Sequence, residues 1–191
     1  HCTVNPVNLM TCSEEERQIK KTVEGKKLVI VGGGIAGMKA AEFAAARGFR
    51  VILFEKEREL GGILRYADFD RFKTTLKRYK DNVAKRIAKM GVDIRLNSPV
   101  QRIVLEGGRA AAVESDGRRE TYDRILVTAA PEVLLKLAPD LPRDFRERLV
   151  KIKYLANACL VMKLDRSLSK TYWLNINDAS IPFVAVVEHT N

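Results

Sequence analysis

The pattern of apolar and polar positions predicts a chain in which strands and helices alternate. Residues 28–31 and 51–54 are short, unbroken apolar runs, which is typical of strands buried on both faces of a parallel sheet. An alanine-rich segment between them is long enough for a helix. Over residues 70–90 the apolar positions recur every three or four residues and predict one buried helical stripe: Phe72, Leu76, Tyr79, Val83, Ile87 and Met90.

Gly91 is a predicted C-cap of this helix. After it the chain contains shorter segments in which apolar and polar residues alternate with a period of two. They predict strands near residues 92–96, 100–105, 109–115 and 120–128. Gly107-Gly108 and Asp116-Gly117 supply turns, so the last three of these strands form a meander, from which Asp123 to Thr128 return to the main parallel sheet. The remaining pattern predicts helices near 131–138 and 142–151, and strands near 154–164, 170–176 and 182–188.

Gly32, Gly34 and Gly37 form a G-x-G-x-x-G motif between the first strand and the helix. Gly32 allows the tight turn, Gly34 lets the backbone approach a pyrophosphate, and Gly37 lets the helix pack closely on the sheet. Glu55 ends the second strand at the distance where an acid accepts hydrogen bonds from a ribose. The predicted pyrophosphate site is Gly32, Gly34, Ile35, Ala36 and Gly37.

The negative charge of Glu55 disfavours a ribose 2′-phosphate and therefore NADP. FAD, NAD and ADP remain open, because each carries an adenosine ribose with free hydroxyls. The segment from Glu55 to Gly61-Gly62 resembles the N-terminal FAD-binding segment of glutathione-reductase-like flavoproteins, and that resemblance favours FAD. It implies that Gly62 lets the chain turn past the cofactor and that Lys56 or Arg58 partly neutralises phosphate charge.

Two wider resemblances divide the chain near Pro99. Residues 1–99, from HCTVNP through the glycine motif to GVDIRLNSPV, resemble the nucleotide-binding half of the 2,4-dienoyl-CoA reductase and trimethylamine dehydrogenase group, which is allied to the old yellow enzymes. That group places the last of four iron–sulfur ligands at the position of Cys2. Only Cys12 and Cys159 accompany it here, so we expect Cys2 to be a remnant ligand and expect no metal cluster.

From Val100 onward, VQRIVLEGGRAAAVESDGRRETYDRILVTAAPEVLLKLAPDLP and the closing YWLNINDASIPFVAVVEHTN are similar to flavin amine oxidases and protoporphyrinogen oxidases. The resemblance implies that Val100 meets the adenine through its backbone. It also implies that the strand ending at residues 127–131 passes beside the cofactor, and that a Gly-Asp segment should follow later. No such segment follows Pro131, and the change of resemblance fits either a divergent hybrid or an engineered chimera.

These patterns predict an α/β protein: a Rossmann-like FAD/NAD(P)-binding fold with a parallel sheet, a β-meander excursion and a partial second subdomain. We expect a charged lead-in over 1–26, with a short helix near Ser13 to Val23, an ADP-binding domain over 27–131, and a truncated subdomain over 132–191. Lys56, Gly62 and Val100 should line the adenine side or the neighbouring turn.

The net charge is +10, with basic side chains before the first strand and along the helix at 70–90. Only 7% of residues are aromatic and no nucleic-acid module is present, so we expect a solvated face, or one that meets an acidic domain or partner, rather than a nucleic-acid surface. No apolar stretch is long enough to span a membrane. The three cysteines lack the spacing of a disulfide framework, which favours a cytoplasmic location.

No catalytic residue can be named. Cys159, Tyr172 and Trp173 are expected to be core residues, and His189 a surface or packing residue. The predicted function is an FAD-binding domain of a flavin-dependent oxidoreductase that recognises the ADP half and is catalytic only if completed by a missing remainder or another subunit. The alternative is a non-catalytic nucleotide-binding or docking domain for ADP, AMP or NAD.

Overall fold

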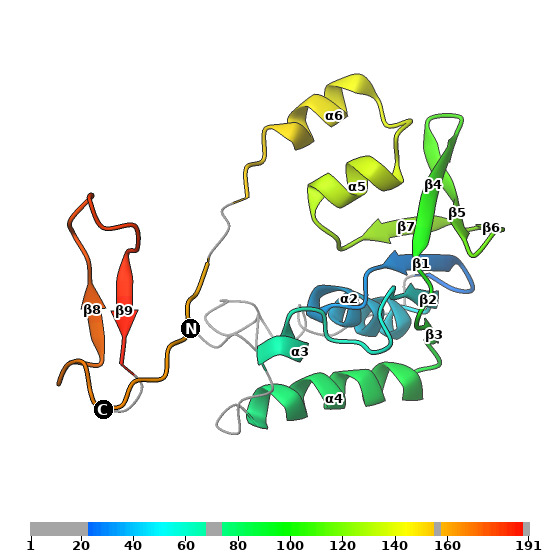
Figure 1. Cartoon of the computed structure of the whole chain (residues 1–191). Coiled ribbons are helices and arrows are strands. Elements are labelled where there is room, and N and C mark those ends of the chain that lie inside the picture. The colour runs from blue at the N-terminus through cyan, green and yellow to red at the C-terminus, as the bar shows by residue number, and fades with distance from the viewer. Residues whose placement is uncertain (1–22, 68–73, 155–157, 189–191) are drawn as a thin grey trace, which may run out of the picture. The chain divides into compact units, whose positions relative to one another are not determined.

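The computed structural model describes residues 23–67, 74–154 and 158–188, and the chain divides into two compact units, His1–Lys153 and Tyr154–Asn191 (Figure 1). Cys2, Cys12, His189 and nearly all of the helix predicted near Ser13 to Val23 therefore lie outside the described residues.

A four-stranded parallel sheet forms the centre of the first unit. Its strands are β1 (Lys27–Val31), β2 (Arg50–Phe54), β3 (Asp93–Arg95) and β7 (Arg124–Val127), in the order β3-β2-β1-β7. Helix α2 (Ile35–Ala46) connects β1 to β2, as the predicted β-α-β unit requires. The return of the chain into this sheet at β7 confirms the prediction for Asp123 to Thr128.

Successive residues of β1 and β2 enter two different apolar clusters, because side chains alternate between the faces of a strand. Helices α2 and α4 (Thr74–Lys89) contact each other and cover one face, where the buried residues include Leu28, Ile30, Met38, Leu53, Val83 and Ile87. The other face packs on the meander through Val29, Ile52, Phe54, Val113 and Tyr122. Both faces of the sheet are thus buried, which explains the unbroken apolar runs in the sequence.

The predicted meander is confirmed as a three-stranded antiparallel sheet. It contains β4 (Val100–Glu106), β5 (Arg109–Ser115) and β6 (Arg118–Thr121) in that order. The turn at Asp116-Gly117 has positive φ at both residues, 50° and 71°, which is the backbone that a two-residue hairpin turn needs.

Among its described residues, the first unit also contains three shorter helices: α3 (Leu64–Ala67), α5 (Pro131–Leu137) and α6 (Arg143–Val150). The stripe predicted on the long basic helix is correct at its centre, where Val83 and Ile87 have no exposed surface. Met90 was wrongly included, because it lies past the last turn of α4 and is 41% exposed. The basic side chains of this helix were expected on its solvated face, but one of them, Lys80, is only 5% exposed.

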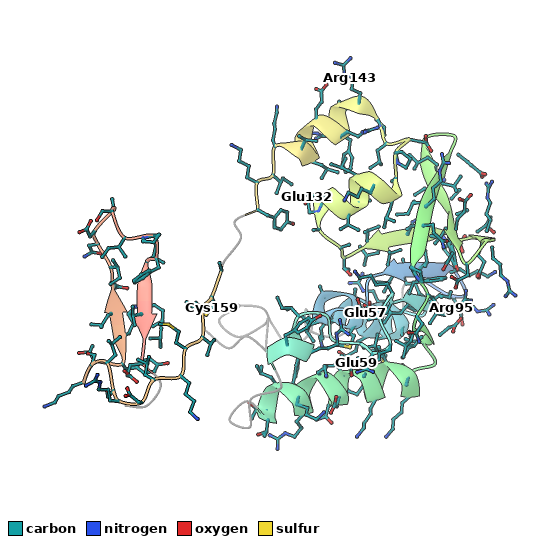
Figure 2. All side chains as sticks on the ribbon, viewed as in Figure 1. Glu57, Glu59, Arg95, Glu132, Arg143 and Cys159 are labelled. Atoms are coloured by element: carbon teal, nitrogen blue, oxygen red, sulfur yellow. The ribbon has the colours of Figure 1, made fainter. Side chains whose placement is uncertain are left out.

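The second unit contains an antiparallel pair, β8 (Trp173–Asn175) and β9 (Ala185–Val187). The strand predicted over 154–164 is absent from the described residues 158–164, and Cys159, labelled in Figure 2, is exposed rather than buried. Trp173 and Tyr172 are also more than half exposed, so their prediction as core residues was wrong. A two-stranded hairpin has no second layer of its own to cover these side chains.

Candidate functional site

The first glycine turn, between β1 and α2, is held by three strands. The Gly32 N–H donates to the Phe54 carbonyl of β2 at 2.9 Å, and the Thr128 hydroxyl, just after β7, donates to the Gly32 carbonyl at 3.0 Å. Gly32 has φ +110°, which favours glycine. A β-carbon on Gly37 would lie 1.8 Å from the Gly32 carbonyl oxygen. Gly37 is therefore required for α2 to begin directly against the turn.

Gly34 is different, because the fold leaves open space beside it. Its backbone is extended, with φ −67° and ψ 178°, and an added β-carbon would have no neighbour nearer than the Gly62 Cα at 3.9 Å. Gly34 is the N-cap of α2 and makes no side-chain cap, and the first turn carries no acidic residue. The first N–H groups of a helix have no acceptor inside the helix, and its dipole favours an anion there.

A second glycine turn packs directly on the first. The Gly61 N–H donates to the Gly33 carbonyl at 2.9 Å, and Gly34 and Gly61 form an isolated parallel β-bridge. Gly62 has φ +54°, and a β-carbon on it would lie 3.0 Å from the Gly34 Cα. The two turns therefore meet backbone to backbone at the start of α2, a contact that neither motif indicates by itself.

Glu55 is buried at the end of β2, with 7% of its surface exposed. Its Oε2 accepts a hydrogen bond from the Gly33 N–H at 2.7 Å, and its Oε1 accepts one from the Glu57 N–H at 2.9 Å. A β-carbon on Gly33 would lie 2.5 Å from Leu60 Cδ2 and 2.9 Å from Glu55 Oε2. Gly33 is thus a site residue that the motif missed, because G-x-G-x-x-G leaves that position free.

The cationic side chains around the second glycine turn differ in how far they are exposed to solvent. The Lys56 side chain is 74% exposed and Arg58 is exposed as well. By contrast, the Arg65 side chain is 14% exposed and its Nε donates to the Gly62 carbonyl at 3.2 Å. The stem of Lys80 also reaches this turn, with its Cδ 2.4 Å from the position of a β-carbon on Gly61. No local sequence signal indicates either contact.

Val100 begins β4 and packs, partly buried, against the apolar cluster between the sheet and the meander. The segment before it is attached to the end of β2, since the Ser98 N–H donates to the Glu55 carbonyl at 3.0 Å. The Ser115 hydroxyl donates to the Pro99 carbonyl at 2.9 Å. Val100 is therefore brought toward the Glu55 side of the site by a hydrogen-bonded connection.

A charged cluster joins the parallel sheet to the meander next to this connection. Arg95, labelled in Figure 2, forms an ion pair with Glu120 of β6 and lies over the Phe54 ring, 5.0 Å from its centroid. The Arg95 guanidinium lowers the pKa of Glu120 below its usual range by hydrogen bonding to the carboxylate. Burial raises the pKa of the Tyr122 hydroxyl, which donates to Glu120 at 3.1 Å. This cluster has a structural role, since it fixes β3 against β6.

Within the described ranges, no group of three or more His, Cys, Asp or Glu side chains is arranged to hold a metal ion. Across the same residues, none of the helices combines the length and the apolar character needed to cross a bilayer. The described site therefore consists of backbone N–H groups, one buried carboxylate and two cationic side chains.

Comparison with known proteins identifies the flavoprotein relatives of this arrangement. The family described as NAD(P)-binding Rossmann-like domain matches residues 30–79, and the family described as flavin containing amine oxidoreductase matches residues 63–183. The second match begins before Val100, where the sequence resemblance to amine oxidases was expected to start. The two matches overlap over residues 63–79, which follow the second glycine turn directly.

Two curated relatives match only a part of this chain. The NADH oxidase of Thermoanaerobacter brockii is 44% identical over 94 residues, which is 49% of this chain and 14% of that protein. The bilirubin reductase of Mediterraneibacter gnavus is 42% identical over 83 residues, which is 44% of this chain and 13% of that protein. The matched part of the chain thus covers about one seventh of the length of each of these relatives.

A solved oxidoreductase from Methanosarcina mazei shares the fold with a TM-score of 0.55, at 13% identity, over 65% of this chain and 64% of that one. The predicted α/β, Rossmann-like class is confirmed, as are the resemblance to flavoproteins in both parts of the chain and FAD as the cofactor. The chain carries a nucleotide-binding domain of a flavin-dependent oxidoreductase. Because the match over residues 63–183 covers most of its length, the chain belongs to the flavin containing amine oxidoreductase family.

Proposed function

We propose that this chain binds the ADP half of FAD at the two packed glycine turns, within a larger oxidoreductase. The observation that carries the proposal is the open space at Gly34, beside N–H groups of α2 that have no acceptor in the helix. A diphosphate would fill this space and accept those N–H groups, helped by the helix dipole. The residues proposed for this contact are Gly32, Gly34, Ile35, Ala36 and Gly37.

Glu55 would hold the adenosine ribose. Its two backbone hydrogen bonds, from Gly33 and Glu57, fix the carboxylate beside the first glycine turn, between β1 and α2. Each carboxylate oxygen can accept more than one hydrogen bond, so both retain capacity for ribose hydroxyls. Gly62 and Val100 would lie on the same side of the ligand. Lys56 is proposed to line this side as well, but its side chain is 74% exposed, so its contact with the ligand has the least structural support.

The redox reaction itself would need residues outside the proposed ADP-binding domain. FAD supplies the redox chemistry when bound, and the protein's share is to hold and orient it. We propose that a further part of the same protein, or another subunit, holds the isoalloxazine ring and the substrate, in a cytoplasmic setting. The domain boundaries proposed for this arrangement remain 27–131 for the ADP-binding domain and 132–191 for a partial subdomain.

Calorimetric titration of the 191-residue chain with ADP, FAD, AMP and adenosine 2′,5′-bisphosphate tests the proposal. We expect ADP and FAD to bind. Adenosine 2′,5′-bisphosphate should bind at least about tenfold more weakly than AMP, which carries the same 5′-phosphate, because the added 2′-phosphate would meet the Glu55 carboxylate. Tighter binding of FAD than of ADP would show that the flavin ring is also held. Failure of the chain to bind ADP at all would overturn the proposed function.

A further inference from the structure

The proposed diphosphate site needs a source of positive charge other than the helix. An α-helix N-terminus supplies the equivalent of about half a positive charge, whereas a diphosphate carries about two negative charges. Lys56 and Arg58, one and three positions after Glu55, are both exposed to solvent. The positive charge that balances the diphosphate would therefore come from side chains that lie at the glycine turns themselves.

Arg65, the second residue of the short helix α3, is held against the second glycine turn. Its Cγ lies 3.3 Å from the position of a β-carbon on Gly61, and its Nε donates to the Gly62 carbonyl at 3.2 Å. The side chain is 14% exposed, so it is largely packed but still accessible. Since Gly62 contacts Gly34, the guanidinium is fixed close to the space assigned to the diphosphate.

The guanidinium also keeps capacity for a ligand. An arginine has five N–H donors. Nε is occupied by the Gly62 carbonyl, and Nη1 lies 3.6 Å from Glu57 Oε2, which is an ion pair rather than a close hydrogen bond. The guanidinium carbon also lies 5.6 Å from the centroid of the Tyr66 ring, a contact that uses no N–H group. N–H groups on the two terminal nitrogens can therefore turn to an anion while Nε maintains the contact with the glycine turn.

We infer that Arg65 is the cation that binds the diphosphate, an inference that rests on the proposed function. A planar guanidinium can donate to the Gly62 carbonyl and to phosphate oxygens at the same time, in a fixed fork. A lysine ammonium at this position would offer the same charge without that geometry. Arg65 therefore gives preference for a diphosphate over a neutral nucleoside, while Glu55 recognises the ribose in both.

The test compares Arg65→Gln, Arg65→Lys and the matched control Arg143→Gln, at an arginine whose side chain is 93% exposed, with ADP measured by calorimetry and adenosine by ligand-observed NMR. We expect Arg65→Gln to weaken ADP binding by about tenfold or more and to change adenosine binding by less than about twofold. Arg65→Lys should recover only part of the loss. Arg143→Gln should bind both ligands as the unmodified chain does.

Urea unfolding of each variant separates binding from folding. Wild-type affinity of Arg65→Gln for ADP would overturn the inference and leave the proposed function standing. A parallel loss of ADP and adenosine binding, or a loss explained by a lower free energy of unfolding, would also overturn it by showing a structural role. If the unmodified chain itself bound no ADP, the proposed function would fail first.

Discussion

The two glycines Gly34 and Gly37 of one motif should respond to the same substitution in opposite ways. Gly34→Ala adds a methyl group where the nearest atom is 3.9 Å away, on a backbone with φ −67° that any residue adopts. An alanine N-cap costs about 0.5–1 kcal/mol relative to glycine, and the lower chain entropy of the unfolded state offsets about that amount. The free energy of unfolding should therefore change by less than about 1 kcal/mol.

The same methyl group should strongly weaken nucleotide binding. It would stand between the Gly34 backbone and the diphosphate, so that the phosphate oxygens could not reach the N–H groups at the start of α2. Loss of two hydrogen bonds to a charged group costs about 3 kcal/mol or more, which is roughly a hundredfold in affinity. Gly34→Val, with a larger side chain in the same space, should abolish binding.

Gly37→Ala is the matched control, because its β-carbon would lie 1.8 Å from the Gly32 carbonyl oxygen. The backbone must move to relieve that contact, and overpacking of this kind costs about 1–3 kcal/mol or more. Urea unfolding and ADP calorimetry on both variants provide the comparison. Wild-type ADP affinity in Gly34→Ala would refute the placement of the diphosphate, and a large loss of its stability would refute the open space.

Two further substitutions test the acid and the charged cluster. Glu55→Ala leaves the Gly33 and Glu57 N–H groups without their acceptor, so the free energy of unfolding and the free energy of ADP binding should each fall by about 1–3 kcal/mol. Urea unfolding and ADP calorimetry on Glu59→Ala, at an exposed neighbour, should show neither loss. The pKa of Glu120 is lowered by Arg95 from an ordinary value of 4.5, so its contribution to stability is present above that pH and is lost as the pH falls through the lower folded-state pKa. Glu120→Gln should therefore be less stable near neutral pH and lose less stability on acidification, in urea titrations at several pH values; an unchanged acid dependence would argue against the pair.

The parts of the fold that depend on local patterns could be predicted from the sequence. The buried strands, the helix after Gly32 and the meander turn at Asp116-Gly117 each follow from a few neighbouring residues. Gly33, Arg65 and Lys80 could not be found in this way, because their roles arise where two turns distant in sequence pack together.

The error at Cys159 has a related physical cause. The apolar residues around it match the composition of a buried strand, but burial depends on a second layer that a local pattern cannot specify. In the second unit, the described residues provide only the β8–β9 hairpin. The composition therefore identified the segment as apolar but did not predict that its side chains are exposed.

The hydrogen bond from Thr128 to Gly32 has a consequence for the order of folding. The two residues are 96 positions apart in the sequence, and the whole meander lies between them. Closing a loop of that length costs about 4 kcal/mol in chain entropy beyond a constant term. The turn at Gly32 can therefore form locally early, but it gains its third support only when β7 joins β1. Pulsed hydrogen exchange during refolding should show the amides of α2 protected before those of β7; simultaneous protection would indicate that the phosphate loop and its distant support form in one step.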